Sequence, residues 1–432
     1  MSGKICDTIK YKLRSFYVVV LGIVAEYNPF HNGHLHLIQE AKQIDSSAVV
    51  LCVMSGNFLQ RGEPAICNKW VRAEMALKSG ADLVIELPFC FSVRSAYFFA
   101  QGALKLLHQT GIITHLAFGA EYDNMQVLSS IADLLANEPL AYSRLFKENM
   151  STGKSFPLAR SLALQQYMGK RSAELQKILP GSNNILAIEY LRVIKEEGFP
   201  FTPILIKRKG SRYYDTEISP YASATAIRQS LLASHGLNEL NESLPQDSLN
   251  ILQREISEGR CPVSLDALER TVLFKLRTMS LQDLSDIYEI NEGLESRFKE
   301  AANNSGTMEQ LLKTVKSKRY SLTRIKRTLM YILFALSNEQ VKRFDQHGPL
   351  YLHILGFSSK GQKILQEMKI NSQIPIFSRG RDIKKARDEH PGTVLQEMID
   401  LDVLATDIYT LLYPDPSQRQ AGKDFTTSPL RV

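Results

Sequence analysis

Two histidines three positions apart form the segment with the clearest chemical potential in this chain. His31 and His34 follow an apolar run over residues 17–24 and a Pro/Gly turn, and a helix is expected to begin near His34. A buried strand that ends in such a turn places both imidazoles at its carboxyl end. Helix N-terminal N–H groups and imidazole donors stabilise phosphate charge, and Gly33 lets the backbone approach a ligand closely. The segment therefore predicts a nucleoside triphosphate site, with attack at the α-phosphate and departure of pyrophosphate.

The His-x-Gly-His pattern is short enough to occur by chance, so its placement matters. The alternative interpretation is that His31 is an ordinary turn residue and His34 only caps the helix. The strand–turn–helix context favours the phosphate interpretation over this alternative.

Composition sets outer limits on the class of protein. A chain of 432 residues suggests two domains, and no apolar run approaches the ~18 residues of a membrane span, so no membrane contact is expected. The basic stretch before residues 16–20 lacks a small-residue cleavage site, which argues against a signal peptide. Five scattered cysteines without a Cys-x-x-Cys pair indicate a reducing, cytoplasmic location and no structural zinc. The formal charge of +7 permits a polyanionic partner without requiring one.

Short apolar segments alternate with helical segments in the first half of the chain. This alternation predicts an α/β fold, a doubly wound Rossmann-like parallel sheet, with a second, mainly α-helical domain. Beyond residue 240 mostly amphipathic helices are predicted, and the polar tail is expected to be flexible. The expected strands are 18–24, 48–54, 83–87, 115–118 and 203–207; the expected helices of the sheet are 35–42, 71–78, 96–108, 158–168, 184–197 and one from 223. The expected units are an extension (1–16), a catalytic ATP-binding domain (17–235), a helical domain (240–414) and a tail (415–432).

A second segment with small hydroxyl residues opens a helix near the end of the predicted α/β domain. Ser223 and Thr225 offer caps and phosphate donors, and Arg228, one turn later, can reach the same anion. A plain N-cap with a surface arginine is the alternative. Taken together with the histidine segment, these residues favour a shared ATP-phosphate site, with His31, His34 and Arg228 in the catalytic role of stabilising phosphate charge.

These two segments resemble the adenylylating nucleotidyltransferase superfamily, and several longer segments resemble the bacterial tRNA(Met) cytidine acetate ligase family. The resemblance extends from Tyr17 onward and is most specific in the first 120 residues. Members of that family usually begin just before the first strand, so the extension is a departure. The segments are VAEYNPFHNGH (24–34), MSGNFLQRGEPA (54–65), FGAE (118–121), NNIL (183–186) and IKR (206–208).

The resemblance implies a two-step reaction. ATP, with Mg²⁺ on its phosphates, activates acetate to acetyl-adenylate and releases pyrophosphate. The exocyclic amine of the wobble cytidine (cytidine 34) of elongator tRNA(Met) then takes the acetyl group, giving N4-acetylcytidine and AMP. No metal site formed by the protein itself is predicted. The positions matching the family's ATP-binding residues are Val24, Ala25, Glu26, Tyr27, Asn28, Pro29, Phe30, His31, Asn32, Gly33, His34, Leu35, His36, Leu37, Gly119, Asn183 and Arg208.

Two of these positions keep an ordinary structural alternative. Asn183, together with Ser182, is also a good helix N-cap. Arg208 is equally compatible with a solvated arginine at a strand end. The loop over residues 56–68, longer than most βα loops, is interpreted as a mobile element that contacts ATP or cytidine, or else as an ordinary solvated loop.

A basic run without acidic residues lies in the predicted helical domain. Such runs are usually solvated faces, but beside the family resemblance this one is predicted to contact the tRNA backbone. Its predicted contact residues are Lys316, Lys318, Arg319, Arg324 and Arg327.

Two other functions remain open at this point. A small-molecule adenylyltransferase or acyl-adenylate ligase of the same superfamily would not need the additional helical, basic residues. A non-catalytic RNA-binding protein would not need His31, His34 and Arg228.

Overall fold

A parallel sheet forms the centre of the computed structural model, which describes residues 18–169, 172–210, 218–233 and 237–432. The predicted extension over residues 1–16 lies outside the described residues. The first five strands are all parallel and lie side by side in the order β5-β4-β1-β2-β3. This arrangement confirms the predicted doubly wound fold. The strands are β1 (Val20–Ala25), β2 (Val49–Ser55), β3 (Leu83–Leu87), β4 (His115–Ala120) and β5 (Thr202–Lys207).

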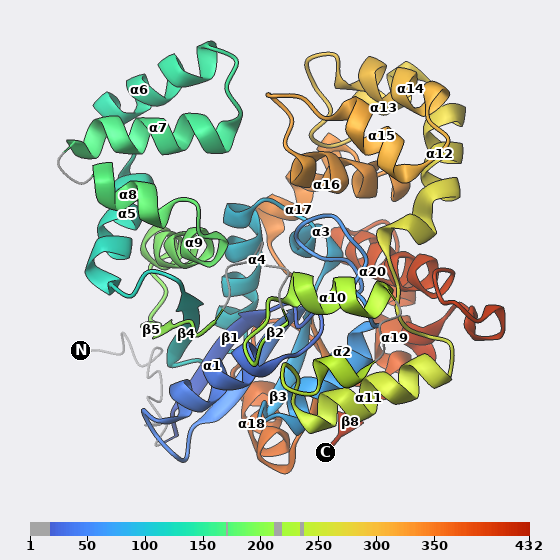
Figure 1. Cartoon of the computed structure of the whole chain (residues 1–432). Coiled ribbons are helices and arrows are strands. Elements are labelled where there is room, and N and C mark those ends of the chain that lie inside the picture. Colours follow the sequence, from blue (N-terminus) through green and yellow to red (C-terminus); the bar gives the residue numbers. More distant parts are fainter. Residues whose placement is uncertain (1–17, 170–171, 211–217, 234–236) are drawn as a thin grey trace, which may run out of the picture.

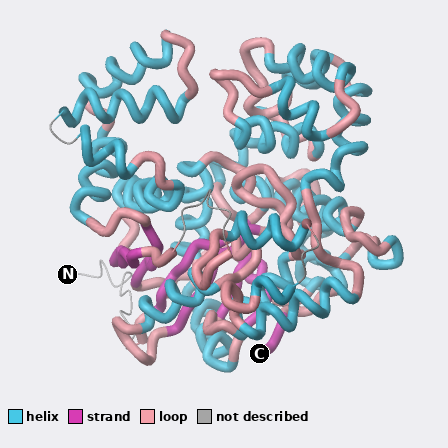
Figure 2. Tube along the Cα trace, viewed as in Figure 1, coloured by secondary structure: helices cyan, strands magenta, loops and turns pink. Residues whose placement is uncertain are grey.

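Helices cover both faces of the sheet, which explains why the strand sequences are continuously apolar (Figure 2). In β2, Val49, Leu51 and Val53 enter one apolar core, and the residues between them enter the other. The first core lies under α4 (Ala96–Gln109), α5 (Met125–Asn137) and α9 (Ser182–Glu197). The second lies under α1 (Asn32–Lys42), α2 (Lys69–Lys78), α10 (Ala224–Leu232) and α11 (Gln246–Ser257).

Two groups of helices rise above the sheet in Figure 1. One is the α6–α7 pair, and the other is a helical unit built from α12 to α17. The unit packs beside the ends of β3 and β2 through Phe334, whose ring centroid lies 4.5 Å from that of Phe89, shortly after β3, and 5.1 Å from that of Phe58, shortly after β2. The bounds are α6 (Leu140–Ser151), α7 (Phe156–Met168), α8 (Ser172–Ile178), α12 (Glu269–Thr278), α13 (Leu281–Ser285), α14 (Leu294–Asn304), α15 (Met308–Val315), α16 (Leu322–Leu333) and α17 (Asn338–His347).

The carboxyl part of the chain returns to the sheet, and the prediction of a mainly helical domain beyond residue 240 does not include these strands. Strand β6 (Leu352–Phe357) pairs antiparallel with β3, and β7 (Ile376–Phe377) and β8 (Leu430–Arg431) pair with β6. The six-residue run of β6 is buried throughout, and a short buried run has no periodicity that separates strand from helix. The remaining helices are α3 (Phe89–Ser92), α18 (Ser359–Asn371), α19 (Gly380–Glu389), α20 (Val394–Thr410) and α21 (Lys423–Thr426), with single 3-10 turns at Leu237–Leu240, Leu265–Leu268 and Pro416–Gln418.

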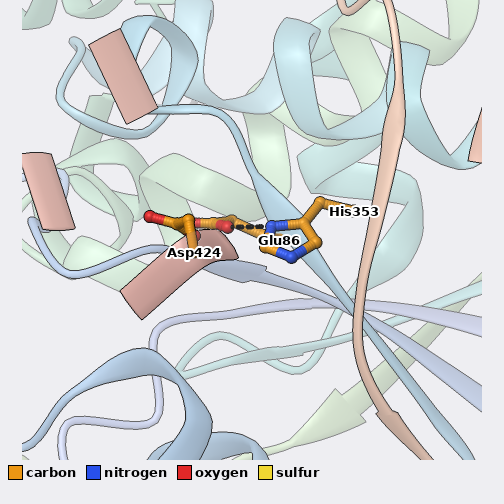
Figure 3. A group of neighbouring side chains, drawn as sticks. All are labelled: Glu86, His353 and Asp424. Atoms are coloured by element: carbon orange, nitrogen blue, oxygen red, sulfur yellow. Dashed lines mark hydrogen bonds and ion pairs between the residues drawn. The ribbon is translucent and has the colours of Figure 1, made fainter. Parts of the chain in front are cut away.

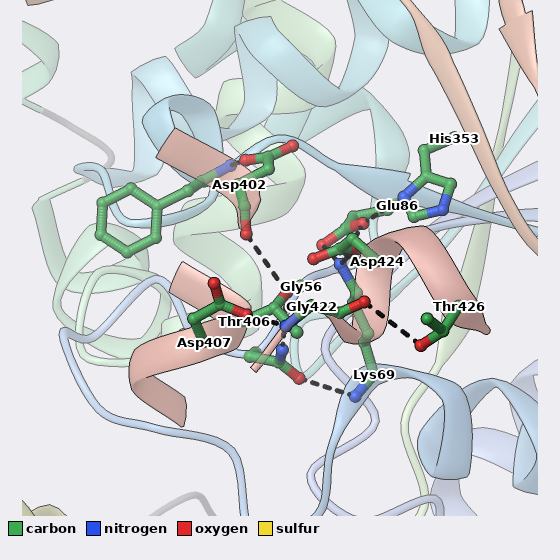
Figure 4. A network of polar contacts seen from close by, with 12 residues as sticks. Gly56, Lys69, Glu86, His353, Asp402, Thr406, Asp407, Gly422, Asp424 and Thr426 are labelled. Carbon is green, nitrogen blue, oxygen red and sulfur yellow. Dashed lines mark hydrogen bonds and ion pairs between the residues drawn. The ribbon is translucent and has the colours of Figure 1, made fainter. Parts of the chain in front are cut away.

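The tail over residues 415–432 is ordered, which corrects the prediction of a flexible segment. Asp424 on α21 is buried and lies 2.6 Å from the ammonium of Lys69, at the start of α2 (Figure 4). The same ammonium donates to both carboxylate oxygens of Glu86 on β3, at 2.9 and 2.8 Å. The polar composition that suggested flexibility thus includes a residue that completes a buried charge network.

Glu86, His353 and Asp424 also lie close enough together to resemble a metal site (Figure 3). Their ligand atoms fall within 4.8 Å of one another, and His353 Nδ1 is 2.6 Å from Glu86. The Lys69 ammonium bonds to both carboxylates and so occupies the position that a cation between them would take. The group is therefore a closed internal ion cluster.

Among the helices of the described ranges, none combines the length and the apolar composition that a membrane crossing requires.

Candidate active site

The turn between β1 and α1 carries the two histidines. Tyr27, two residues after the end of β1, adopts a left-handed conformation, with φ of 48°. Helix α1 begins at Asn32, with His31 as its N-cap, and not near His34 or Leu35 as predicted. The helix starts earlier because both imidazoles satisfy backbone donors of its first turn.

The histidines form a reciprocal capping box. Nδ1 of His31 accepts from the N–H of Gly33 at 3.0 Å, and Nδ1 of His34 accepts from the N–H of His31 at 3.2 Å. Their rings stack, with centroids 3.8 Å apart. A Cβ on Gly33 would lie 2.8 Å from Cε1 of His31, so glycine is required there for the packing of the ring. Both histidines therefore cap helix α1, as the alternative interpretation had it for His34. These capping bonds also decide which ring nitrogen of each histidine carries the proton.

Because each Nδ1 is an acceptor, the proton of each neutral ring is on Nε2. Burial lowers the pKa of His31 to about 3 and holds that of His34 well below its usual value. Nearby positive charge, from Arg208 for both rings, lowers both values further. Both rings are therefore neutral Nε2–H donors at physiological pH.

These pKa values predict acid sensitivity of the fold. An unfolded histidine titrates near 6.5 and folded His31 near 3, so between these pH values the unfolded chain binds a proton that the folded chain does not. The free energy of unfolding is therefore highest above pH 6.5 and falls as the pH decreases toward 3. The loss is about 1.4 kcal/mol per pH unit in this window. We expect His31→Asn, which keeps a capping acceptor without a titrating ring, to lose about 2 kcal/mol less than wild type between pH 6.5 and 4.5. Urea unfolding at both pH values measures this difference, and equal losses would contradict it.

The other residues over 24–37 either pack against the histidine rings or hold the turn in place. Tyr27 and Phe30 are buried, and their rings contact that of His34 at 4.9 and 5.5 Å between centroids. Asn28 Oδ1 accepts from the N–H of Ile66, and Asn32 Nδ2 donates to the carbonyl of Glu242. These positions hold the turn. Val24 and Ala25 end β1, Pro29 lies within the turn, and Leu35, His36 and Leu37 belong to α1.

Arg208, Gly119 and Asn183 meet at the carboxyl ends of β4 and β5, as the prediction of one site requires. A Cβ on Gly119 would lie 3.1 Å from Cγ of Arg208, so the glycine lets the arginine lie along the strand. Nη1 of Arg208 is 3.4 Å from Oδ1 of Asn183. Arg208 is part-buried and its charge lowers the pKa of both histidines, so it is not a freely solvated strand-end residue.

The cap of α9 differs from the alternative proposed for Asn183. The N-cap is Gly181, and Glu121 accepts from the N–H groups of Asn183 at 3.3 Å and Asn184 at 2.9 Å. Glu121 also accepts from Nδ2 of Asn183 at 2.7 Å, which orients the amide. The sequence indicated that Glu121 follows a strand, but not that it caps a helix 60 residues later.

Helix α10 joins the site from the other side of the histidine turn. Ser223 is its N-cap and accepts from Ala226 at 3.0 Å. Arg228 donates to the carbonyl of Asn28 at 2.9 Å and to Oγ1 of Thr225 at 3.3 Å. Ser223 is therefore the N-cap of α10, and Arg228 is not a surface arginine, because it is tied to the turn that carries the histidines.

The loop over residues 56–68 is fixed in place, which contradicts the prediction of a mobile element. Most of its residues are buried, and Phe58 and Pro64 form an antiparallel bridge. The N–H of Gln60 donates to Oε1 of Glu26 at 2.8 Å, so the loop borders the turn. A Cβ on Gly62 would clash with the backbone of α16, which shows how closely the helical unit packs here.

The basic run is partly neutralised in space, although its own sequence contains no acidic residue. Arg319 pairs with Glu292, and Arg327 lies 3.8 Å from Glu289. Arg324 donates to the carbonyl of Glu289 and lies over the ring of Tyr320. The two lysines of the predicted set, Lys316 and Lys318, are exposed.

The strand–turn–helix histidine site on a doubly wound sheet is that of a nucleotidyltransferase. The sequence matches the HIGH Nucleotidyl Transferase family over residues 18–424, and the chain belongs to that family.

Within it, the chain belongs to the tRNA(Met) cytidine acetate ligases. The protein of that name from Syntrophomonas wolfei is 58% identical over 413 residues, covering 96% of this chain and 99% of the relative. The protein of that name from Halothermothrix orenii is 40% identical, covering 94% and 98%.

Solved structures agree with this assignment. The crystal structure of apo Thermotoga maritima TmcAL has a TM-score of 0.91 and 37% identity, covering 96% of this chain and 99% of that one. The same protein bound with alpha-thio ATP has a TM-score of 0.89 and 38% identity, covering 96% and 100%.

Proposed function

We propose that this protein is an ATP-dependent ligase that forms N4-acetylcytidine at cytidine 34, the wobble position of elongator tRNA(Met). The reaction uses ATP, as its magnesium complex, and acetate, and it releases pyrophosphate and AMP. The names of the relatives support the acceptor and the acid, and the ATP analogue bound by the Thermotoga maritima protein supports the nucleotide.

The observation that carries the proposal is the pair of fixed imidazole donors between two arginines. In the first step, an acetate oxygen attacks the α-phosphorus of ATP, the P–O bond to the β-phosphate breaks, and pyrophosphate leaves. Neutral Nε2–H donors of His31 and His34 stabilise the charge that develops, with Arg208 and Arg228 on either side. No proton needs to move in this step, which suits rings that are not protonated at pH 7.

In the second step, the cytidine amine attacks the acetyl carbonyl carbon and AMP leaves. The amine loses one proton, and the wobble base must be unstacked to reach the acyl group. Lys316, Lys318, Arg319, Arg324 and Arg327 are proposed to contact the tRNA backbone. Such contacts orient the tRNA without reading its bases.

Labelled acetate tests the whole proposal. Purified protein is incubated with ATP-Mg, labelled acetate and total bacterial tRNA, and the tRNA is digested to nucleosides. Label in N4-acetylcytidine is the expected result. Acetyl-adenylate without labelled tRNA would mean that the acceptor is wrong, and neither product would favour a small-molecule adenylyltransferase.

Lys316 and Lys318 offer the cleanest test of the tRNA surface, because both are exposed. We expect the double variant Lys316→Glu/Lys318→Glu to bind tRNA about tenfold more weakly at moderate salt, with a shallower salt dependence. Acetate-dependent ATP turnover should be unchanged. Filter binding across a salt series measures the effect, and wild-type affinity would remove these lysines from the interface. The Arg324→Glu/Arg327→Glu variant should also weaken binding, but these arginines contact Glu289 within the helical unit, so its stability must be measured alongside.

We place the reaction in the cytoplasm. The four described cysteines, Cys52, Cys67, Cys90 and Cys261, are buried free thiols, which suits a reducing compartment.

A further inference from the structure

Arg72, on the first turn of α2, is a fully buried arginine beneath the proposed site. Its guanidinium donates to four backbone carbonyls. Nη1 bonds to Glu26 at 2.5 Å, Nε bonds to Cys67 at 3.0 Å, and Nη2 bonds to Ser55 at 3.1 Å and also to Gly56. One side chain therefore gathers backbone from three separate segments.

These carbonyls lie where the site is built. Glu26 is the first residue after β1, Ser55 is the last residue of β2, and Gly56 and Cys67 belong to the loop that follows β2. Neighbouring bonds continue the connection, because Gln60 donates to the Glu26 carboxylate. The loop and the histidine turn are thus fixed to each other around one guanidinium.

The placement of this charge is costly. All four bonds go to neutral carbonyl oxygens, and no carboxylate of the described residues forms an ion pair with the guanidinium. A buried charge held in this way is more expensive than an apolar side chain of similar size. Burial accordingly lowers the pKa of Arg72. A fork of donors that reaches several carbonyls at once is specific to arginine, and a lysine cannot reproduce it.

We propose that Arg72 is a positioning residue for adenylate formation, which holds the turn bearing His31 and His34 at the distance from the 56–68 loop that the transition state requires. This inference rests on the proposed function. The Nε2–H donors act only where charge develops, and an error of about 1 Å in such a group can cost about 100-fold in rate. Arg208 follows β5 and contacts Asn183 on α9, and within the described residues Arg72 bonds to neither of them, so the inference concerns the histidine turn alone.

The kinetic test compares Arg72→Lys with Arg254→Lys. Arg254, on α11, contacts the same helix from outside through Glu74, at 2.7 Å. In acetate-dependent ATP–pyrophosphate exchange, we expect Arg72→Lys to lower kcat 10- to 100-fold with the KM for ATP changed less than threefold. Arg254→Lys should match wild type in both constants. The melting temperature of each variant is measured, and the assays are run at a temperature at which all variants are folded.

A measurement without turnover separates this inference from the proposed function. In ¹⁵N-histidine NMR spectra, the Nδ1 and Nε2 shifts of His31 and His34 report the capping bonds and the tautomer. We expect these shifts to move in Arg72→Lys and to stay in place in Arg254→Lys.

Unmoved shifts in folded Arg72→Lys, or a wild-type kcat in an active enzyme, would overturn the positioning role. If wild type itself shows no acetate-dependent exchange, the proposed function fails, and the NMR comparison still decides whether Arg72 sets the histidine geometry.

Discussion

Replacing His34 by alanine is expected to lower the rate of acetyl-adenylate formation by about 10³, near the upper end of what one lost oxyanion donor costs. The variant loses the Nε2–H donor of His34 and also the acceptor for the N–H of His31, which is 3.2 Å from Nδ1. The ring of His31 then loses its stacking partner at 3.8 Å, so the second donor is displaced as well. Acetate-dependent exchange of labelled pyrophosphate into ATP measures the loss. The affinity for tRNA should stay within about twofold, because the basic residues lie on the helical unit.

His115 provides the matched control for this variant. It lies at the opposite, amino end of the same sheet, at the start of β4, where its Nδ1 is 2.8 Å from Thr114 Oγ1. We expect His115→Ala to form acetyl-adenylate at the wild-type rate. His34→Gln, whose amide offers one acceptor and one donor, should lose less than His34→Ala. An undiminished yield of acetyl-adenylate in His34→Ala would refute the proposed role.

The parallel sheet and the position of the site were predictable because both follow from local patterns. A strand buried on both faces is apolar throughout, as Val49 to Met54 are, and the carboxyl ends of parallel strands meet at one edge. His31, Gly119 and Arg208 each follow or end such a strand. Their convergence therefore needed only the correct strand assignment.

What escaped prediction depends on contacts between distant segments. Glu289 and Glu292 neutralise part of the basic run from outside it, and Glu121 caps a helix 60 residues further along. Strand β6 is a short apolar run whose pairing with β3 is decided by tertiary packing. Arg72 carries no motif at all, because its partners are main-chain carbonyls that any residue type supplies.

The largest loss of stability is expected for Lys69→Met. The Lys69 ammonium is fully buried between Glu86 and Asp424, at 2.8 and 2.6 Å, and its removal leaves two buried carboxylates facing each other without the charge that bridges them. Removing one partner of a buried ion pair typically costs 3–5 kcal/mol, so we expect the free energy of unfolding to fall by about that amount. Urea unfolding measured by circular dichroism tests this value.

The pH dependence identifies the cause of that loss. In wild type, burial opposes ionisation of Glu86, but the ammonium outweighs it and holds the pKa of Glu86 below its usual value. Without the ammonium, burial and the charge of the second carboxylate raise the pKa of Glu86 above that of the unfolded chain. Such a group contributes most stability when protonated, so the deficit of Lys69→Met should be smaller at pH 5 than at pH 8.

Lys78→Met is the control, because Lys78 ends the same helix as an exposed partner of Glu74 at 3.9 Å, and such surface pairs contribute little. Adding Asp424→Asn to Lys69→Met should restore part of the stability by removing one of the two charges. If Lys69→Met lowers the free energy of unfolding no more than Lys78→Met does, the ion cluster is not what fixes the C-terminal tail.

The position of Lys69 also bears on activity, because its N–H donates to Asn57 of the 56–68 loop at 2.8 Å. The C-terminal segment thereby supports, through one lysine, the same loop that Arg72 joins to the histidine turn.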